Sequence, residues 1–262
     1  MSDTTLRGRH ALVTGASSGL GADFARELAS RGADLTLVAR RRELLEAVRD
    51  EVGARHGVEV ALVPLDLTEP GAPEALHASA DGGGHPVDVL VNNAGYALYG
   101  PFAEIPWERE ANMSSSTWSC RSHLTKLFLP GMLARDRGYV LNVASIGAYL
   151  PSPLYASYSA AKSFVLNFTE ALSYELRGTG VRATALSPGI TATQFLEVAG
   201  QRATRYQRMA MMQSPEVVRI GVDAMLKGRP SVVSGRLNAV SAWSNRLIPR
   251  RLSAAVANRL MT

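Results

Sequence analysis

The stretch Thr14-Gly15-Ala16-Ser17-Ser18-Gly19-Leu20-Gly21 decides the fold. It overlaps the end of an apolar run of strand length at residues 10–14, and a helical pattern over residues 20–30 begins inside it. Its three glycines allow a tight turn, a close approach of the backbone to a ligand, and close packing of the helix on the strand. Because the first turn of a helix presents free amides and a partial positive charge, the stretch predicts a loop that holds a pyrophosphate.

Further apolar runs alternate with segments of helical period along the chain. Near-continuous apolar strands separated by helices are typical of a parallel sheet covered on both faces. Right-handed crossovers make such a sheet doubly wound, with a ligand crevice beyond the carboxyl ends of its strands. The sequence therefore predicts an α/β fold with a mainly parallel sheet of about seven strands. The expected strands are residues 10–14, 35–39, 58–65, 87–92, 139–144, 181–187 and 231–233, and the expected helices are 20–30, 42–56, 73–80, a long stretch after Pro106, and 155–177.

The composition is that of an ordinary globular protein. Of 262 residues, 46% are hydrophobic and 19% charged, which excludes disordered and fibrous classes. We expect one domain over residues 1–262. The single cysteine, Cys120, cannot form an internal disulfide, and the amino terminus shows no apolar signal stretch, so we expect a cytoplasmic location. No apolar run reaches the length of about 18 residues that a membrane span needs.

Three further motifs follow the glycine stretch in a fixed order. Asn92-Asn93-Ala94-Gly95 closes the fourth expected strand, Ser145 follows the fifth, and Tyr158-Ser159-Ala160-Ala161-Lys162 begins thirteen residues after Ser145. Together the four motifs resemble the short-chain dehydrogenase/reductase family, in its compact single-domain branch, over about residues 8–235. The resemblance implies a Rossmann-like fold and an oxidoreductase that moves hydride between a nicotinamide and a carbonyl or secondary alcohol carbon.

The catalytic prediction rests on Ser145, Tyr158 and Lys162. A helix places Tyr158 and Lys162 on one face, because they are four residues apart. A phenol ionises at about pH 10, and we expect the lysine ammonium and a cationic nicotinamide to lower its pKa. Tyr158 then serves as general acid or base, and Ser145 hydrogen-bonds the substrate oxygen. The resemblance implies that Lys162 also holds the nicotinamide ribose. Taken alone, a tyrosine and a lysine at this spacing are more often a surface pair.

Cofactor choice is predicted from the end of the second strand. A carboxylate there normally binds a free ribose 2′-hydroxyl, whereas a guanidinium suits a 2′-phosphate. The sequence has Arg40 and Arg41 and no acid, which predicts NADP(H) with Arg40 as the main phosphate ligand. The alternative is a basic first turn of the next helix, to which we assign Arg42. The other predicted cofactor-binding residues are Gly15, Ser17, Ser18, Gly19, Leu20, Gly21, Asn93, Ala94, Gly95, Tyr158 and Lys162, with Asp66, Leu67, Pro188, Gly189 and Thr191 implied by the resemblance; no metal is expected.

One segment departs from the family pattern. The family carries an asparagine in the helix between the fourth and fifth strands, and counting from both flanks puts its place at Thr117. Residues 114–122 also lack the apolar periodicity of a buried helix. Codons for residues 114–121 can be chosen that, one base out of frame, read Glu-Leu-Asn-Val-Val-Val-Pro-Leu, a family-like run with an asparagine. We hypothesise such a compensated frame change. Peptide mass mapping that recovers residues 114–122 as they stand contradicts it, and the protein is then expected to have weakened turnover with cofactor binding intact.

The substrate side is predicted to be lipophilic. A lid over about residues 190–213 is apolar and rich in methionine, which adapts to varied shapes. We expect a lipophilic ketone or secondary alcohol, with the resemblance favouring ketosteroid or 3-ketoacyl substrates; the alternative is that the methionines fill the core. The expected pocket residues are Tyr96, Leu98, Tyr99, Ile146, Leu150, Leu154, Tyr155, Phe195, Leu196, Val198, Tyr206, Met209, Met211 and Met212.

The carboxy-terminal part is strongly basic. From Gln201 onward, eleven Arg or Lys residues stand against two carboxylates. Because aromatic interleaving and reading motifs are missing, nucleic acid is not expected. Residues 236–262 form a basic amphipathic tail that covers the pocket, packs at a subunit contact, or makes peripheral contact with an anionic membrane. The resemblance implies a homodimer or homotetramer.

Two other functions stay open. A catalytically weakened dinucleotide-binding regulatory or scaffold protein is favoured only by the unusual segment around Thr117. A sugar-nucleotide epimerase or dehydratase of the longer-chain branch is disfavoured by the glycine spacing and by the short carboxy-terminal sequence.

Overall fold

The computed structural model describes residues 5–81 and 85–261. Within them, seven strands form one sheet in which every neighbouring pair is parallel, as predicted. The order is β3-β2-β1-β4-β5-β6-β7, so the chain extends the sheet from β1 in one direction and then from β4 in the other. The strands are β1 (His10–Thr14), β2 (Asp34–Ala39), β3 (Val60–Pro64), β4 (Val87–Asn92), β5 (Gly138–Val143), β6 (Val181–Ser187) and β7 (Ser231–Val233).

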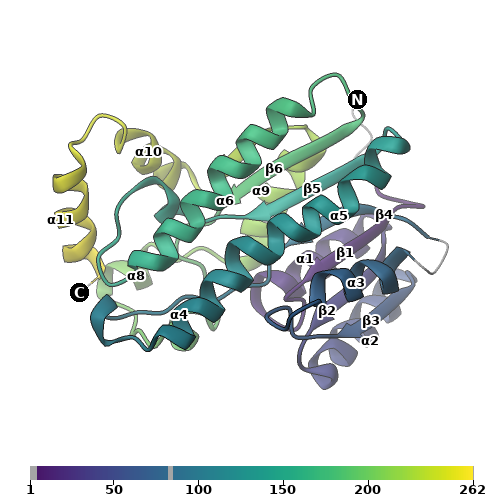
Figure 1. The fold of residues 1–262 in the computed structure, drawn as a ribbon, viewed down its shortest axis with the longest axis horizontal. Coiled ribbons are helices and arrows are strands. Elements are labelled where there is room, and N and C mark those ends of the chain that lie inside the picture. The colour runs from purple at the N-terminus through teal and green to yellow at the C-terminus, as the bar shows by residue number, and fades with distance from the viewer. Residues whose placement is uncertain (1–4, 82–84, 262) are drawn as a thin grey trace.

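Helices cover both faces of the sheet (Figure 1). Successive strand residues point to opposite faces, so Val13 joins the core under one helical layer and Leu12 the core under the other. Each layer therefore has its own apolar core. The first layer contains α1 (Gly19–Ser30), α2 (Arg42–His56) and α9 (Ser214–Leu226), and the second contains α3 (Ala72–Asp81), α5 (Cys120–Ala134) and α6 (Ala156–Glu175).

The expected strand over residues 58–65 is too long. β3 covers only Val60–Pro64 and alternates partly buried with exposed residues. It is the edge strand and pairs only with β2. One side of its backbone has no partner strand, which explains why the apolar run is not ordered over its full length.

The helical stretch expected after Pro106 is interrupted. It consists of α4 (Trp107–Ser114), a π-helical turn η2 (Ser115–Ser119), and α5. Serine hydroxyls donate to helix carbonyls here: Ser116 to Met113, and Ser122 to Trp118. Such side-chain bonds compete with the regular helical ladder. The interruption therefore coincides with the segment that lacks apolar periodicity.

The segments after β6 gather at one end of the molecule (Figure 1). α7 (Phe195–Ala199) and α8 (Arg205–Met209) occupy the expected lid, and α8 lies against α11. The tail forms α10 (Arg236–Ser244) and α11 (Arg250–Met261), which are separated by a turn that contains Pro249. Two short 3-10 helices, η1 (Phe102–Glu104) and η3 (Ile146–Tyr149), complete the elements.

Candidate active site

A cavity of about 500 Å³ lies beyond the carboxyl ends of the strands. It is located where the strand order reverses between β1 and β4, the place at which doubly wound sheets bind ligands. Every predicted catalytic and cofactor-binding residue lines it except Gly21. The structure therefore brings together Gly15, Ser17, Ser18, Gly19, Leu20, Arg40, Arg41, Asp66, Leu67, Asn93, Ala94, Gly95, Ser145, Tyr158, Lys162, Pro188, Gly189 and Thr191.

The glycine loop forms one wall of this cavity. Gly15 and Gly19 have φ angles of +67° and +52°, which L side chains rarely adopt. Gly21 lies behind the loop rather than in the cavity, so its predicted contact with the cofactor is not seen. A Cβ at Gly21 would be 1.9 Å from the Gly15 carbonyl oxygen. Gly21 is therefore needed for the packing of α1 against the loop.

The loop is fixed to the end of β4. The Thr14 hydroxyl accepts hydrogen bonds from the amides of Asn93 (2.9 Å) and Ala94 (3.0 Å). In return, the Asn93 side-chain amide donates to the Thr14 carbonyl at 2.9 Å. The two segments that flank the reversal point therefore form one rigid unit.

The amino-terminal end of α1 is suited to an anion. Its first turn contains no acidic residue, and the Ser18 side chain makes no capping hydrogen bond. Ser17, Ser18 and Leu20 all line the cavity. First-turn amides without a helical or side-chain partner carry the positive end of the helix dipole. A phosphate group fits this part of the cavity.

Arg40 stands at the outer end of the cavity. Its side chain is 75% exposed, and its Nη1 lies 3.7 Å from the Asp66 Oδ2. Burial raises the pKa of Asp66, but hydrogen bonds from Thr68 and the charge of Arg40 outweigh it, and the net pKa is lowered. The guanidinium is thus only loosely held and faces solvent.

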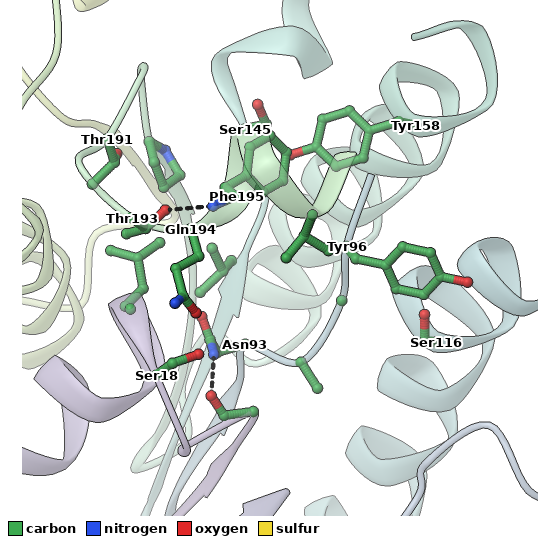
Figure 2. Close-up of a pocket in the computed structure, with 18 of the residues that line it drawn as sticks. Ser18, Asn93, Tyr96, Ser116, Ser145, Tyr158, Thr191, Thr193, Gln194 and Phe195 are labelled. Carbon is green, nitrogen blue, oxygen red and sulfur yellow. Dashed lines mark hydrogen bonds between the residues drawn. The ribbon is translucent and has the colours of Figure 1, made fainter. Parts of the chain in front are cut away.

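Ser145, Tyr158 and Lys162 meet at the other end. Ser145 follows β5, and its Oγ accepts the Gly147 amide at 3.1 Å. Tyr158 and Lys162 are one turn apart on α6, with the lysine Nζ 5.6 Å from the centre of the phenol ring. Lys162 also donates to the Val143 carbonyl at 2.7 Å. Figure 2 shows Ser145 next to Tyr158, and a hydrogen bond joins their side chains.

The expected lowering of the Tyr158 pKa is wrong for the chain by itself. Burial raises the pKa of Tyr158 to about 12 and outweighs the opposing effects of the Ser145 hydrogen bond and the Arg121 charge. The pKa of Lys162 is well below its usual value, because it is buried and because Arg121 is nearby. The cation that favours the Tyr158 phenolate here is therefore Arg121 rather than Lys162.

Arg121 is a buried cation that sequence reasoning missed. Its Nη2 donates to the carbonyls of Asn93 (3.0 Å) and Ala94 (2.6 Å), and its Nη1 donates to the Val143 carbonyl, which Lys162 shares. Its Nε has no hydrogen-bond partner within the described part of the chain. Burial lowers the pKa of Arg121 to about 10. An arginine in a helix expected to be buried was the available signal.

The position assigned to the family asparagine does not face the cavity. Thr117 is fully buried, and its hydroxyl is directed at the Met113 sulfur, 3.8 Å away. Ser116, one residue earlier, lines the cavity (Figure 2). The side chain presented to the site from η2 is therefore a serine hydroxyl, which donates to the Met113 carbonyl.

The apolar part of the cavity differs from the expected one. Seven expected residues line it: Tyr96, Ile146, Leu150, Tyr155, Phe195, Leu196 and Val198. The Phe195 ring is 5.5 Å from the Tyr158 ring, between their centres. Seven others do not line it: Leu98, Tyr99, Leu154, Tyr206, Met209, Met211 and Met212. Met209 is 78% exposed, and Met212 packs on the core of the first layer, so the lid methionines do not shape the pocket.

Two lid glutamines contribute instead, and sequence reasoning missed them. Gln201 and Gln207 line the cavity and are buried. The Tyr155 hydroxyl donates to the Gln201 Oε1 at 2.7 Å, and the Gln207 side-chain amide donates to the same oxygen at 3.1 Å. Their hydropathy gave no signal, since glutamines in short helices usually face water. The apolar pocket therefore contains a polar group.

Residues 9–203 match the sequence model of the short chain dehydrogenase family. The chain belongs to this family. An uncharacterized oxidoreductase of Myxococcus xanthus strain DK1622 is 34% identical to this short-chain dehydrogenase over 256 residues, 96% of this chain and 97% of that one. A very-long-chain 3-oxoacyl-CoA reductase of Pyrenophora tritici-repentis is 30% identical over 268 residues, 98% of this chain and 74% of that one.

Solved structures share the architecture. A 7β-hydroxysteroid dehydrogenase studied for its stereoselectivity superposes on this short-chain dehydrogenase with a TM-score of 0.88, at 26% identity over 98% of this chain and 99% of that one. A short-chain dehydrogenase of Sphingobium yanoikuyae in complex with NADPH has a TM-score of 0.81 at 27% identity, covering 91% and 94%. One of Burkholderia phymatum in complex with NAD has a TM-score of 0.82 at 25% identity, covering 91% and 92%. The protein is thus an oxidoreductase of this family.

Proposed function

We propose that this short-chain dehydrogenase transfers hydride between NADP(H) and a lipophilic ketone or secondary alcohol. The observation that carries the proposal is that Ser145, Tyr158 and Lys162 share one cavity with the glycine loop at the amino-terminal end of α1. A proton donor thus lies in the same space as a site suited to a dinucleotide phosphate.

A nicotinamide dinucleotide fits the residues present. The loop glycines leave no side chain between the backbone and a pyrophosphate, and the first turn of α1 is without an acid. NADPH and NAD are bound by two of the similar solved structures. When bound, the cofactor supplies the hydride chemistry and, in its oxidised form, a positive charge. We assign the pyrophosphate to residues 15–20, the adenine side to Asp66 and Leu67, and the nicotinamide side to Asn93, Ala94, Gly95, Pro188, Gly189 and Thr191.

Tyr158 handles the proton in this proposal. Its hydroxyl donates to the substrate oxygen during carbonyl reduction and takes the proton back during alcohol oxidation. The Ser145 oxygen already accepts the Gly147 amide, so its own proton remains for the substrate oxygen as negative charge develops there. Lys162 is held on the Val143 carbonyl and has further donors for the nicotinamide ribose.

The substrate class follows from the rest of the cavity. Apolar side chains of η3 and α7 face Tyr158, which suits a lipophilic body. The buried Tyr155–Gln201–Gln207 group supports a second polar function some way from the reacting carbonyl. The similar 7β-hydroxysteroid dehydrogenase and very-long-chain 3-oxoacyl-CoA reductase act, by their names, on lipophilic substrates.

The choice of NADP(H) rests on Arg40. β2 ends at Ala39, where no carboxylate is present to hold a 2′-hydroxyl, and Arg40 and Arg41 line the cavity immediately after it. The Arg40 guanidinium is free enough to turn toward a 2′-phosphate, because its contact with Asp66 is 3.7 Å long and exposed.

Steady-state rates with NADPH and NADH, on a panel of lipophilic and small ketones, test this function. We expect turnover of the lipophilic ketones with NADPH preferred. In Arg40→Asp, kcat/KM for NADPH is expected to fall about 10–100-fold with little loss for NADH, because a charged hydrogen bond to the phosphate is lost. Arg42→Ala is the matched control, since that side chain is exposed and paired with Glu46. Equal losses for both cofactors would contradict the assignment.

A second candidate is a dinucleotide-binding regulatory or scaffold protein with little catalysis. It is favoured by the crowding of Arg121 against Lys162, which disfavours the lysine's charged form. In that case the protein binds NADPH but turns over no ketone of the panel.

Domain boundary, location and assembly are also proposals. Residues 1–262 are proposed as one domain, since the cofactor side and the substrate side belong to one sheet and its connections. We propose a cytoplasmic location, consistent with the single buried Cys120. A homodimer or homotetramer is proposed by analogy with the family.

A further inference from the structure

The tail helices expose an unusual number of large apolar side chains. Along α10 and the following turn, Leu237, Val240, Trp243 and Leu247 are 59–87% exposed. Their spacing of three or four residues places them on one side of α10 and of the turn that follows. Leu252 and Val256 repeat the pattern on α11 at 55% and 50% exposure. Exposed apolar residues in such a row usually mark an interaction surface.

The tail helices are nevertheless attached to the protein by small residues. Ala242 of α10 and Ser253 and Ala257 of α11 are buried, and the Ser253 hydroxyl donates to the Asn245 side chain at 3.0 Å. The buried side of each helix is thus narrow and contains small residues, while the large apolar residues face outward. This is the reverse of a helix whose apolar side covers its own core.

The charge of the same helices is uniform. Residues 224–262 contain seven Arg or Lys and no carboxylate. The arginines of the tail are exposed, and none forms an ion pair with a described residue of the chain. They are Arg236, Arg246, Arg250, Arg251 and Arg259. The partner of this surface must therefore be both apolar and anionic.

We propose that the tail surface, residues 236–259, binds the surface of an anionic lipid bilayer. Arginines pair with lipid phosphates while leucine, valine and tryptophan enter the boundary between headgroups and acyl chains, where tryptophan is favoured. A second copy of the chain fits less well, since a symmetric contact through this surface sets arginines against arginines. The attachment is peripheral: among residues 5–81 and 85–261, no helix is long and apolar enough to span a membrane.

The position of this surface gives the contact a consequence. α11 packs against α8 of the lid, and Val198 of the neighbouring α7 lines the cavity while 56% exposed. A lipophilic substrate dissolved in the bilayer would thus be released near the cavity entrance. This consequence, though not the binding itself, rests on the proposed function.

Vesicle flotation tests the proposal with the whole protein. Vesicles of phosphatidylcholine with phosphatidylglycerol, about 3:1, are expected to carry the protein at about 0.1 M salt and to lose most of it at about 1 M. Vesicles of phosphatidylcholine alone should bind at least about tenfold less, because the arginines then lack an anionic partner. No association of the folded protein with anionic vesicles overturns the proposal.

Matched variants assign the binding to the tail. Arg250→Gln/Arg251→Gln is expected to weaken anionic binding roughly tenfold or more, and Trp243→Ser to weaken it as well. The controls are Arg55→Gln/Arg219→Gln and Trp107→Ser, which alter exposed side chains elsewhere and should bind as the unaltered protein does. Equal loss in both sets, or none in the tail set, overturns it.

Sedimentation velocity distinguishes a bilayer from a second copy. We expect Trp243→Ser to leave the sedimentation coefficient unchanged. Dissociation of an oligomer by this variant, without vesicle binding by the unaltered protein, overturns the proposal and makes the tail a subunit contact. Failure of the ketone panel would leave the flotation result intact, so the two proposals fail separately.

Discussion

Tyr158→Phe is expected to lower kcat for ketone reduction by about 10²–10⁴-fold, with NADPH affinity unchanged. The substitution removes only the hydroxyl that donates to the substrate oxygen, and the ring keeps its contact with Phe195, 5.5 Å away. Cofactor contacts elsewhere in the cavity are untouched. Stopped-flow rates with the best ketone of the panel, together with an NADPH fluorescence titration, measure the two effects separately.

Tyr155→Phe is the matched control for this prediction. Tyr155 is the residue before α6, its ring lies 5.8 Å from that of Tyr158, and its hydroxyl is engaged by Gln201. Its loss is expected to change KM for the substrate and to keep kcat within about tenfold. Similar falls of kcat in both variants would mean that Tyr158 is not the proton donor.

The pH dependence adds a second measurement on the same residue. Burial raises the pKa of Tyr158 to about 12, and oxidation of an alcohol requires the phenolate. The rate of oxidation in the unaltered protein should therefore increase with pH across the neutral and alkaline range. Tyr158→Phe should lose this increase.

Gly21→Ala is expected to weaken NADPH binding at least about 100-fold and to destabilise the fold by about 1–3 kcal/mol or more. The added Cβ would lie 1.9 Å from the Gly15 carbonyl oxygen and 2.7 Å from the Asn93 amide nitrogen. Backbone on one side and a bonded side chain on the other leave no direction of relief except movement of the loop. Isothermal titration with NADPH and a thermal melt measure both effects.

Gly53→Ala controls for the chemical change itself. Gly53 lies inside α2, and the nearest atom to an added Cβ is the Val58 carbonyl oxygen at 4.0 Å. Alanine is favoured over glycine in a helix, so this variant should be more stable by about 0.5–1 kcal/mol and bind NADPH normally. Unchanged affinity in Gly21→Ala would show that the loop has room that its geometry denies.

The central sheet was predictable because each strand is decided locally. The apolar runs at residues 10–14, 87–92 and 181–187 match β1, β4 and β6 residue for residue. Both faces of these strands are covered, so nothing but apolar side chains fits there. Strand ends were less predictable at the edge of the sheet, as β3 shows.

The site divides in the same way. Its motif residues were predictable because each lies directly after a strand, in segments that a parallel sheet brings to one edge. Gln201, Gln207 and Arg121 were not, since their roles depend on neighbours distant in sequence. The Tyr158 pKa also depends on burial in the folded chain, which spacing along a helix does not reveal.

The Val143 carbonyl oxygen is a fixed point that two helices share. It belongs to the backbone of a central strand, so no substitution at residue 143 can delete it, and it accepts from Lys162 of α6 and Arg121 of α5 together. The electrostatics of the lysine can consequently be adjusted only through the side chain at position 121. A neutral residue there would leave the whole oxygen to Lys162 and make that lysine a stronger cation, so the second helix acts as a tuning element for chemistry that the first helix performs.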